Sequence, residues 1–404
     1  MITILGGGIA GLTTAYYLSN LTSEKILVIE KEKELGGPCR CINISGKMMP
    51  ITYHHILKSD KNILKLIKEF GLEKKLFWIH SDMSFYKKGK HNTFRSLSKI
   101  LKYKGLNFYE KYLLVKFISK AIFGFYDSLE NSKAAYIIEK ETNKHIYNEI
   151  FEPLLRFKFG EAKKLVISKW VTERMKLKEA SSKFGFLKGG LGILLNSLET
   201  SLFKKKIKIL KKHEIKKLKI GYRKHKIYFT GGKSIETDKI VSTLPWPVFS
   251  KIEKGFMEDY SKIKYTTAIS IILKLDKKIN FPYWTNILDD KTHIGGIFNY
   301  PSKDSIVYLA KYEFGDCDNL VADKMVKEFL KISGLKLNNI IKKRIYKIPY
   351  ADPIFDKLYQ FKNTGQNMKR GIFFAGINQL PFKTNMDTAV KSAYNIAKCI
   401  KLKK

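Results

Sequence analysis

The sequence predicts an α/β fold in which one domain is assembled from discontinuous segments and a second, α+β domain is interleaved with it. Two observations support this prediction. A glycine-rich turn joins a strand to a helix at the start of the chain, and another buried strand followed by a helix closes it. Between them lie long helical patterns and groups of alternating strand patterns. A chain of 404 residues is long enough for two domains.

The first element is the strand Ile2–Leu5, which runs directly into the sequence Gly6-Gly7-Gly8-Ile9-Ala10-Gly11. Gly6 permits the sharp turn, Gly8 lets a pyrophosphate approach the backbone, and Gly11 lets the following helix pack against the strand. Because Ile9 and Ala10 open that helix, its N-terminus faces the phosphates. The motif therefore predicts a dinucleotide site.

A second strand, Ile26–Ile29, ends in Glu30, and Lys31 follows it. A carboxylate at this position can accept both hydroxyls of an adenosine ribose and repels a 2′-phosphate, which disfavours NADP. The alternative is a tight turn that binds nothing. The combination of strand, helix, second strand and terminal acid favours the binding site.

The formal charge of +39 at first suggests nucleic-acid binding. The basic residues are almost all lysine, however, and they are dispersed through a chain rich in Ile, Asn, Tyr and Phe. This pattern indicates a compositional bias, so no nucleic-acid partner is predicted. A functional anionic surface, a membrane or a polymer, stays open as the alternative.

Four cysteines neither form a disulfide framework nor have the spacing of metal ligands, so the sequence predicts no metal site and a reducing cytoplasm. A signal peptide is not expected, because its cleavage would remove the first strand. No apolar stretch reaches the length of a membrane span. Peripheral contact at the inner face of the membrane and the oligomeric state stay open.

Residues 60–185 have mainly helical patterns, such as those of residues 62–70 and 97–126. Residues 112–123 are strongly apolar with interspersed lysines. We expect a core helix there, and a helix lying in a membrane interface is the alternative. Gly189-Gly190-Leu191-Gly192 then opens a helix with a leucine stripe.

Short alternating runs follow at 206–210, 213–220, 226–230 and 239–243, and they predict a small meander. A second group of strands is predicted at 268–275, 294–298 and 306–312, before a helix at 320–332. The chain closes with a buried strand in 371–376 and a helix whose N-terminus, near 385–388, is expected to point toward the ligand.

Five segments together resemble the flavin-containing amine oxidases, with the protoporphyrinogen oxidases and phytoene desaturases as relatives. They are the Gly6 to Gly11 motif with Glu30, the doublet Gly36-Gly37 with Arg40, residues 185–192, residues 241–245, and the closing strand with its helix. The resemblance implies a Rossmann-like FAD-binding domain made of residues 1–57, 185–255 and 365–404. Residues 58–184 and 256–364 would form the substrate domain.

The same resemblance implies positions around FAD. Backbone at Gly36-Gly37 would close over the pyrophosphate, and Arg40 can pair with it bidentately. A residue placed like Ile215 would hold the adenine through its backbone, and Gly376, Asn385 and Met386 would contribute from the closing segment. Asn378 stands where many relatives carry an acid near the ribityl chain.

Residues 53–56, Asp60, residues 153–160 and Trp170 resemble a protoporphyrinogen-oxidase-like subgroup without a settled substrate. His54 or His55 is a candidate for lining the flavin or acting as a general base, and the alternative role is to fix the loop through hydrogen bonds. Arg156, with Lys158, is a candidate anchor for an anionic substrate, and the alternative is an ordinary ion pair.

The function expected from these residues is an FAD-dependent oxidoreductase that takes a hydride from a large, partly apolar small molecule. The alternative is a non-redox flavoenzyme similar to UDP-galactopyranose mutase, which would need arginines such as Arg156 and Arg174 to clamp a diphosphate. A cysteine placed for a covalent flavin link is not found, because Cys399 lies late in the last helix.

Overall fold

The computed structural model of this chain describes residues 1–93, 96–176, 183–255, 258–315, 320–362, 370–376, 379 and 384–402. It divides into two compact units. Unit 1 comprises Met1–Phe77, Phe186–Lys264 and Gln360–Lys404, and unit 2 comprises Trp78–Gly185 and Tyr265–Tyr359. The first boundary lies at 77/78, later than the expected 57/58, because helix α2 (Lys61–Glu69) packs against helix α13 (Met386–Leu402) within unit 1.

Unit 1 is built on a parallel five-stranded sheet with the order β10-β2-β1-β14-β20. Its strands are β1 (Ile2–Leu5), β2 (Ile26–Ile29), β10 (Lys208–Leu210), β14 (Lys239–Ser242) and β20 (Ile372–Phe374). The first two strands are apolar and buried along their whole length, as expected where both faces of a sheet are covered. The prediction of a meander at 206–243 is therefore wrong for β10 and β14, which pair in this sheet.

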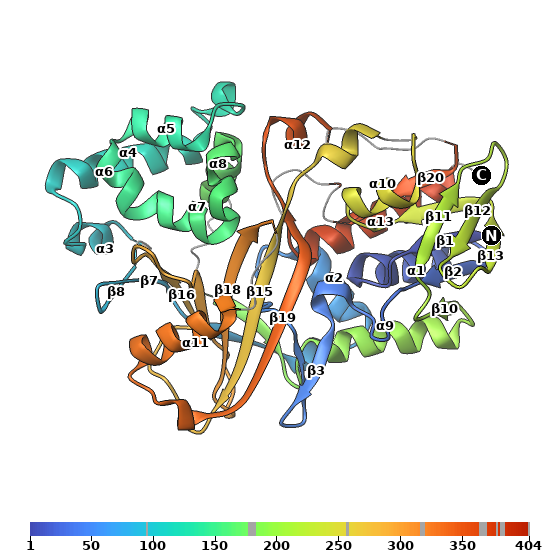
Figure 1. Ribbon diagram of the computed structural model, residues 1–404, viewed down its shortest axis with the longest axis horizontal. Helices are drawn as coiled ribbons and strands as arrows, with labels where there is room; N and C mark the ends of the chain where they lie inside the picture. Colours follow the sequence, from blue (N-terminus) through green and yellow to red (C-terminus); the bar gives the residue numbers. More distant parts are fainter. Residues whose placement is uncertain are drawn as a thin grey trace. The chain divides into compact units, whose positions relative to one another are not determined.

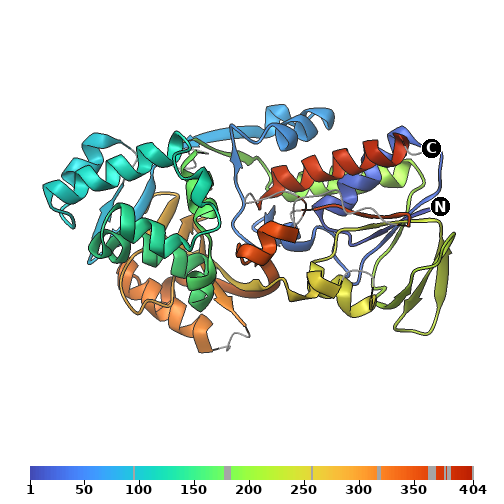
Figure 2. The same ribbon diagram turned by 90° about the horizontal axis from the view of Figure 1, so that it is seen from above.

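Helices cover one face of this sheet and a small antiparallel sheet covers the other (Figure 2). The helices are α1 (Ile9–Leu21), α9 (Gly192–Lys204) and α13. The second layer contains β11 (Ile215–Lys219), β12 (His225–Phe229), β13 (Ser234–Thr237) and helix α10 (Trp246–Ile252). The leucine stripe of α9 is buried, and so is the predicted apolar face of α13. A hairpin of β3 (Cys41–Ile44) and β4 (Lys47–Pro50) and the short strand β5 (Ile56–Leu57) complete the unit.

Unit 2 contains a seven-stranded sheet with the order β19-β15-β18-β17-β16-β7-β8. The strands are β7 (Met83–Lys87), β8 (Lys90–Asn92), β15 (Tyr265–Leu275), β16 (Trp284–Ile287), β17 (Gly296–Asn299), β18 (Ile306–Phe314) and β19 (Ile340–Pro353). Helix α11 (Leu320–Ser333) buries Met325 and Phe329 in the core that Ile271 and Leu309 share. The predicted strands at 268–275, 294–298 and 306–312 and the helix at 320–332 are confirmed.

The remaining helices of unit 2 gather at one end of it (Figure 1). They are α3 (Leu97–Lys102), α4 (Phe108–Ile122), α5 (Ala134–Glu141), α6 (Lys144–Ile146), α7 (Glu152–Phe159) and α8 (Ser168–Lys176). The chain passes between the units within β6 (Leu76–His80), β9 (Lys183–Leu187) and α12 (Lys357–Lys362). The prediction of a mainly helical stretch at 60–185 is wrong at residues 76–92, which form β6, β7 and β8.

Candidate cofactor site

The glycine motif forms a turn between β1 and α1, at the carboxyl end of the central strand. Gly6 has a φ of +103°, and its backbone N–H donates to the carbonyl of Ile29 at 2.9 Å. At Gly11 a Cβ atom would lie 1.9 Å from the carbonyl oxygen of Gly6, so no other residue fits there. Both glycines are therefore required by the packing of the protein itself.

Gly8 is different, because neither its conformation nor its neighbours require glycine. Its φ of −71° suits any residue, and a Cβ atom there would have no neighbour closer than 3.9 Å. Gly8 is the N-cap of α1, where the first backbone N–H groups of a helix have no partner within the helix. The structure thus presents unobstructed backbone donors, as close approach of a phosphate requires.

Glu30 is buried, and its carboxylate is held by two backbone N–H groups. Gly7 donates to Oε2 at 2.7 Å, and Glu32 donates to Oε1 at 2.9 Å. Each carboxylate oxygen keeps a second lone pair, which can accept a ribose hydroxyl. The predicted acid is therefore ordered beside the glycine turn, while Lys31 is exposed and lies 3.8 Å from Glu32.

The segment that contains Gly36, Gly37 and Arg40 lies against the same turn. Gly36 donates to the carbonyl of Gly7 at 2.8 Å and forms a parallel bridge with Gly8. Gly36 and Gly37 have φ values of +112° and +57°, and a Cβ atom on Gly36 would meet the backbone of Arg40 at 2.8 Å. The structure therefore brings the two predicted phosphate-contacting segments together.

The chain folds back so that its last strand and helix complete this region. A Cβ atom on Gly376 would lie 3.8 Å from that of Ala10, in the first turn of α1, and the Gly376 N–H donates to the Ser392 hydroxyl at 3.0 Å. Asn385 caps α13, since its side chain accepts the Thr388 N–H at 3.0 Å, and Met386 is buried. Asn378 lies outside the described residues.

The segment before β11 lies next to Glu30. The His213 N–H donates to the carbonyl of Glu30 at 3.0 Å, and the Lys212 N–H donates to that of Glu32. Ile215 begins β11 two residues later and is half-buried. Its predicted backbone contact with adenine stays a prediction.

The two candidate histidines are half-buried in unit 1. His54 Nε2 lies 2.8 Å from the Thr52 hydroxyl and 3.3 Å from the carbonyl of Pro38, directly after Gly37. Burial lowers the pKa of His54 to about 4, and burial with repulsion from His54 lowers that of His55 to about 3. Both rings are neutral near pH 7, as a general base must be, but pKa values this far below 7 make them weak bases there. The contacts of His54 are those of a residue that fixes the glycine loop.

The candidate anionic anchors lie in unit 2, and each already has a partner. Arg156 Nε is 3.3 Å from Glu152, one turn earlier in α7. Lys158 forms an ion pair with the buried Asp352, and Arg174 stacks over Trp170 at 4.7 Å. These contacts favour structural roles over substrate binding.

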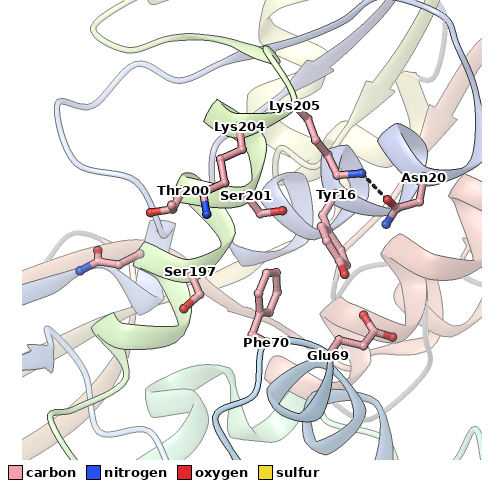
Figure 3. Close-up of a pocket in the computed structure, with 10 residues that line it drawn as sticks. Tyr16, Asn20, Glu69, Phe70, Ser197, Thr200, Ser201, Lys204 and Lys205 are labelled. Carbon is pink, nitrogen blue, oxygen red and sulfur yellow. Dashed lines mark hydrogen bonds between the residues drawn. The ribbon is translucent and has the colours of Figure 1, made fainter.

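A separate cavity of about 520 Å³ opens between α1, the end of α2 and α9 (Figure 3). Its lining combines the rings of Tyr16 and Phe70 with polar side chains such as Glu69, and Lys205 donates to Asn20 across it. None of the predicted cofactor residues lines this cavity.

The described part of the chain has neither a candidate metal cluster nor a candidate membrane span. No group of three or more His, Cys, Asp or Glu side chains there could hold a metal ion. No helix there is long and apolar enough to cross a membrane. Cys39 and Cys41 are free thiols, and burial raises the pKa of Cys39 to about 12.

Residues 9–401 match the family model described as flavin containing amine oxidoreductase. The chain therefore belongs to this family, and its fold is the α/β fold of FAD-dependent amine oxidase-like proteins. FAD is its cofactor.

Solved structures share this fold over the whole chain. A reduced UDP-galactopyranose mutase has 15% identity and a TM-score of 0.80, with 100% of this chain and 94% of that chain covered. Cyclohexylamine oxidase from Brevibacterium oxydans IH-35A has 12% identity, a TM-score of 0.79 and 100% and 98% coverage. A protein from Exiguobacterium sp. 255-15, provisionally described as a protoporphyrinogen oxidase, has 16% identity, a TM-score of 0.78 and 100% and 99% coverage. Comparison with curated proteins gives no match.

The residues of unit 1 fit FAD. The open side of Gly8 and the first turn of α1 would receive the pyrophosphate, with Arg40 available to pair with it, and Glu30 would accept the ribose hydroxyls. When bound, the flavin supplies a two-electron acceptor that no side chain provides. The sequence did not single out Ser392, which fixes Gly376, or Asp387, which joins α13 to α2; both are ordinary residues in a helix until the fold is known.

Proposed function

We propose that this protein is an FAD-dependent oxidoreductase that removes a hydride from a C–H bond of a large, partly apolar small molecule. The FAD-dependent part of this proposal rests on the open side of Gly8, which faces the first turn of α1 and is flanked by Gly36. Packing demands Gly6 and Gly11 but not Gly8, so a ligand is the physical reason for a glycine there. Membership in a family of flavin oxidoreductases supports the redox role.

The proposed substrate class is supported by the composition of unit 2. Its helices carry many apolar and aromatic side chains with interspersed lysines. Such a composition favours an isoprenoid, porphyrin-like or lipid-linked molecule over a small polar amine. A sugar-nucleotide reaction has no specific observation in its favour, because Arg156 and Arg174 are engaged with Glu152 and Trp170.

The test is anaerobic titration of the FAD-loaded protein with candidate substrates. Oxidation of a substrate should bleach the visible flavin absorbance, and admission of oxygen or another acceptor should restore it. A panel of isoprenoid, porphyrinogen and lipid-linked compounds should contain the active class, and small polar amines should leave the spectrum unchanged. Failure of the purified protein to take up FAD would refute the proposal. Binding of UDP-galactose by calorimetry without bleaching would support the mutase-like alternative instead.

A further inference from the structure

Large exposed apolar side chains concentrate in one stretch of unit 2. Within the described residues of this unit, Phe108 is 81% exposed, Tyr112 is 55% exposed and Phe123 is 78% exposed. The neighbouring side chains Leu97, Leu101, Tyr109 and Phe125 are exposed as well. Isolated exposed apolar residues are ordinary, whereas a contiguous group of this kind marks an interaction site.

Phe108 and Tyr112 of α4 and Phe123, the residue that caps its C-terminus, share one face. Phe108, Tyr112 and Phe123 are four and eleven residues apart, which places them within a sector of roughly 60° on a helix. Lys116 lies at the edge of that sector. The opposite face holds Leu114, Phe117 and Ala121, which are buried in unit 2. The apolar segment at 112–123 is thus a core helix on its inner side, as predicted. We call its outward face the aromatic face, which consists of Phe108, Tyr109, Tyr112, Lys116 and Phe123.

The surroundings of the aromatic face are cationic. Residues 96–123 contain six lysines and a single acid, Glu110. Glu110 is buried, and its carboxylate accepts the Asn107 N–H at 2.9 Å and lies 2.7 Å from His145. Lys111 donates to the carbonyl of Leu101 at 2.8 Å, which holds the exposed leucines of α3 next to α4. Lys120 pairs with Glu141 of α5 at 3.2 Å, and the other five lysines leave an excess of positive charge beside the aromatic rings.

We propose that the aromatic face docks α4 on a bilayer surface that contains anionic lipid, with the helix lying in the plane of the interface. Tyrosine and phenylalanine suit the boundary between headgroups and acyl chains, and lysines reach the negatively charged headgroups through their apolar stems. A second copy of the chain would suit the aromatic face less well than a bilayer does. A two-fold interface would bring the lysines of one copy against those of the other, while Glu110 is buried and Glu141 already pairs with Lys120.

The experiment is co-sedimentation of the FAD-loaded protein with vesicles of about three parts phosphatidylcholine to one part phosphatidylglycerol, and with pure phosphatidylcholine vesicles. The wild type should sediment with the anionic vesicles and several-fold less with the neutral ones, and added salt should weaken binding. The triple variant Phe108→Ser, Tyr112→Ser, Phe123→Ser should bind at least about tenfold more weakly. Lys104→Gln and Lys116→Gln should each weaken binding by about fivefold.

The matched controls are Phe203→Ser with Tyr222→Ser, which change side chains in unit 1 that are 80% and 91% exposed, and Lys216→Gln with Lys217→Gln. These variants should bind as the wild type does. Because all the altered side chains are exposed, every variant should keep the wild-type melting temperature. The proposal is overturned if the wild type stays in the supernatant with anionic vesicles or if the triple variant binds as its control does. It is also overturned if sedimentation velocity shows a dimer that only the triple variant dissociates, since the face then binds another copy.

Discussion

The carboxylate of Asp387, in the first turn of α13, caps helix α2, which lies 325 residues earlier in the chain. It accepts the backbone N–H of Asn62 at 2.6 Å and that of Ile63 at 2.9 Å, and the Asn62 side-chain amide at 3.0 Å. On the other side of the same junction, Asn385 donates to Asp60 at 3.2 Å. One acid therefore fastens the end of the chain to an early helix.

Replacing Asp387 by Ala should lower the free energy of unfolding by about 2 kcal/mol, because two backbone donors of α2 would lose a buried acceptor. Asp387→Asn keeps one carbonyl oxygen and should lose less. Asp323→Ala is the matched control, since Asp323 lies in the first turn of α11 but is largely exposed. Urea unfolding measures all three, and equal losses for Asp387→Ala and Asp323→Ala would contradict the capping role.

Gly8→Ala and Gly11→Ala should separate cofactor binding from folding. At Gly8 the added methyl group meets no protein atom but occupies the approach of the pyrophosphate, so FAD affinity should fall by at least about tenfold while the apoprotein stays folded. At Gly11 the methyl group would collide with the Gly6 carbonyl, so the protein should fail to fold. Flavin fluorescence titration and circular dichroism distinguish the two results. Unchanged FAD affinity in Gly8→Ala would place the pyrophosphate elsewhere.

Glu30→Gln should weaken FAD binding by about tenfold, since a charged acceptor for the ribose hydroxyls is replaced by a neutral amide. The exposed neighbour Glu32 gives the control Glu32→Gln, which should bind FAD normally. Calorimetry with FAD and with AMP tests the assignment to the adenosine half: AMP affinity should fall in parallel with FAD affinity. A loss for FAD but not for AMP would contradict it.

The two half-buried histidines, His54 and His55, should make stability depend on pH. Their pKa values are about 4 and about 3 in the folded protein against an ordinary 6.5. As the pH falls below 6.5, the unfolded chain therefore binds protons before the folded protein does. The stability that the neutral rings contribute is complete above pH 6.5 and is lost as the pH falls toward the pKa values of the folded protein. His54→Gln should lose less stability than the wild type between pH about 7 and about 5. His80→Gln, at an exposed position, should follow the wild type, and a parallel course for His54→Gln would contradict the assignment.

Lys158 tests the difference between a structural ion pair and a substrate anchor. Its ammonium group pairs with the buried Asp352 and lies 4.1 Å from the centre of the Tyr312 ring. Lys158→Met should cost about 3 kcal/mol, because it leaves a buried carboxylate unpaired, and adding Asp352→Asn should recover much of that loss. Thermal unfolding measures both. A Lys158→Met variant of normal stability with a raised KM would instead identify an anchor.

The sequence could predict those residues whose conformation depends on neighbours that are close in the sequence. Gly6 and Gly11 are fixed by the sterics of one turn, and the buried face of α13 follows from its helical periodicity. Strand β19 was missed because its lysine-rich, largely exposed sequence has no apolar alternation, and its register comes from pairing with β15. The placement of α2 in unit 1 depends on Asp387, and a contact over that separation leaves no local signal.

The return of α13 to α1 sets an order for folding during synthesis. Helix α1 is buried on nearly all sides, and part of that cover comes from a helix that begins only at residue 386. The ribosome therefore releases the glycine turn long before the segment that encloses it has been made. The nascent chain must keep the apolar helix α1 partly uncovered until α13 has been made, so the cofactor site that the two helices flank can be enclosed only after that point in synthesis.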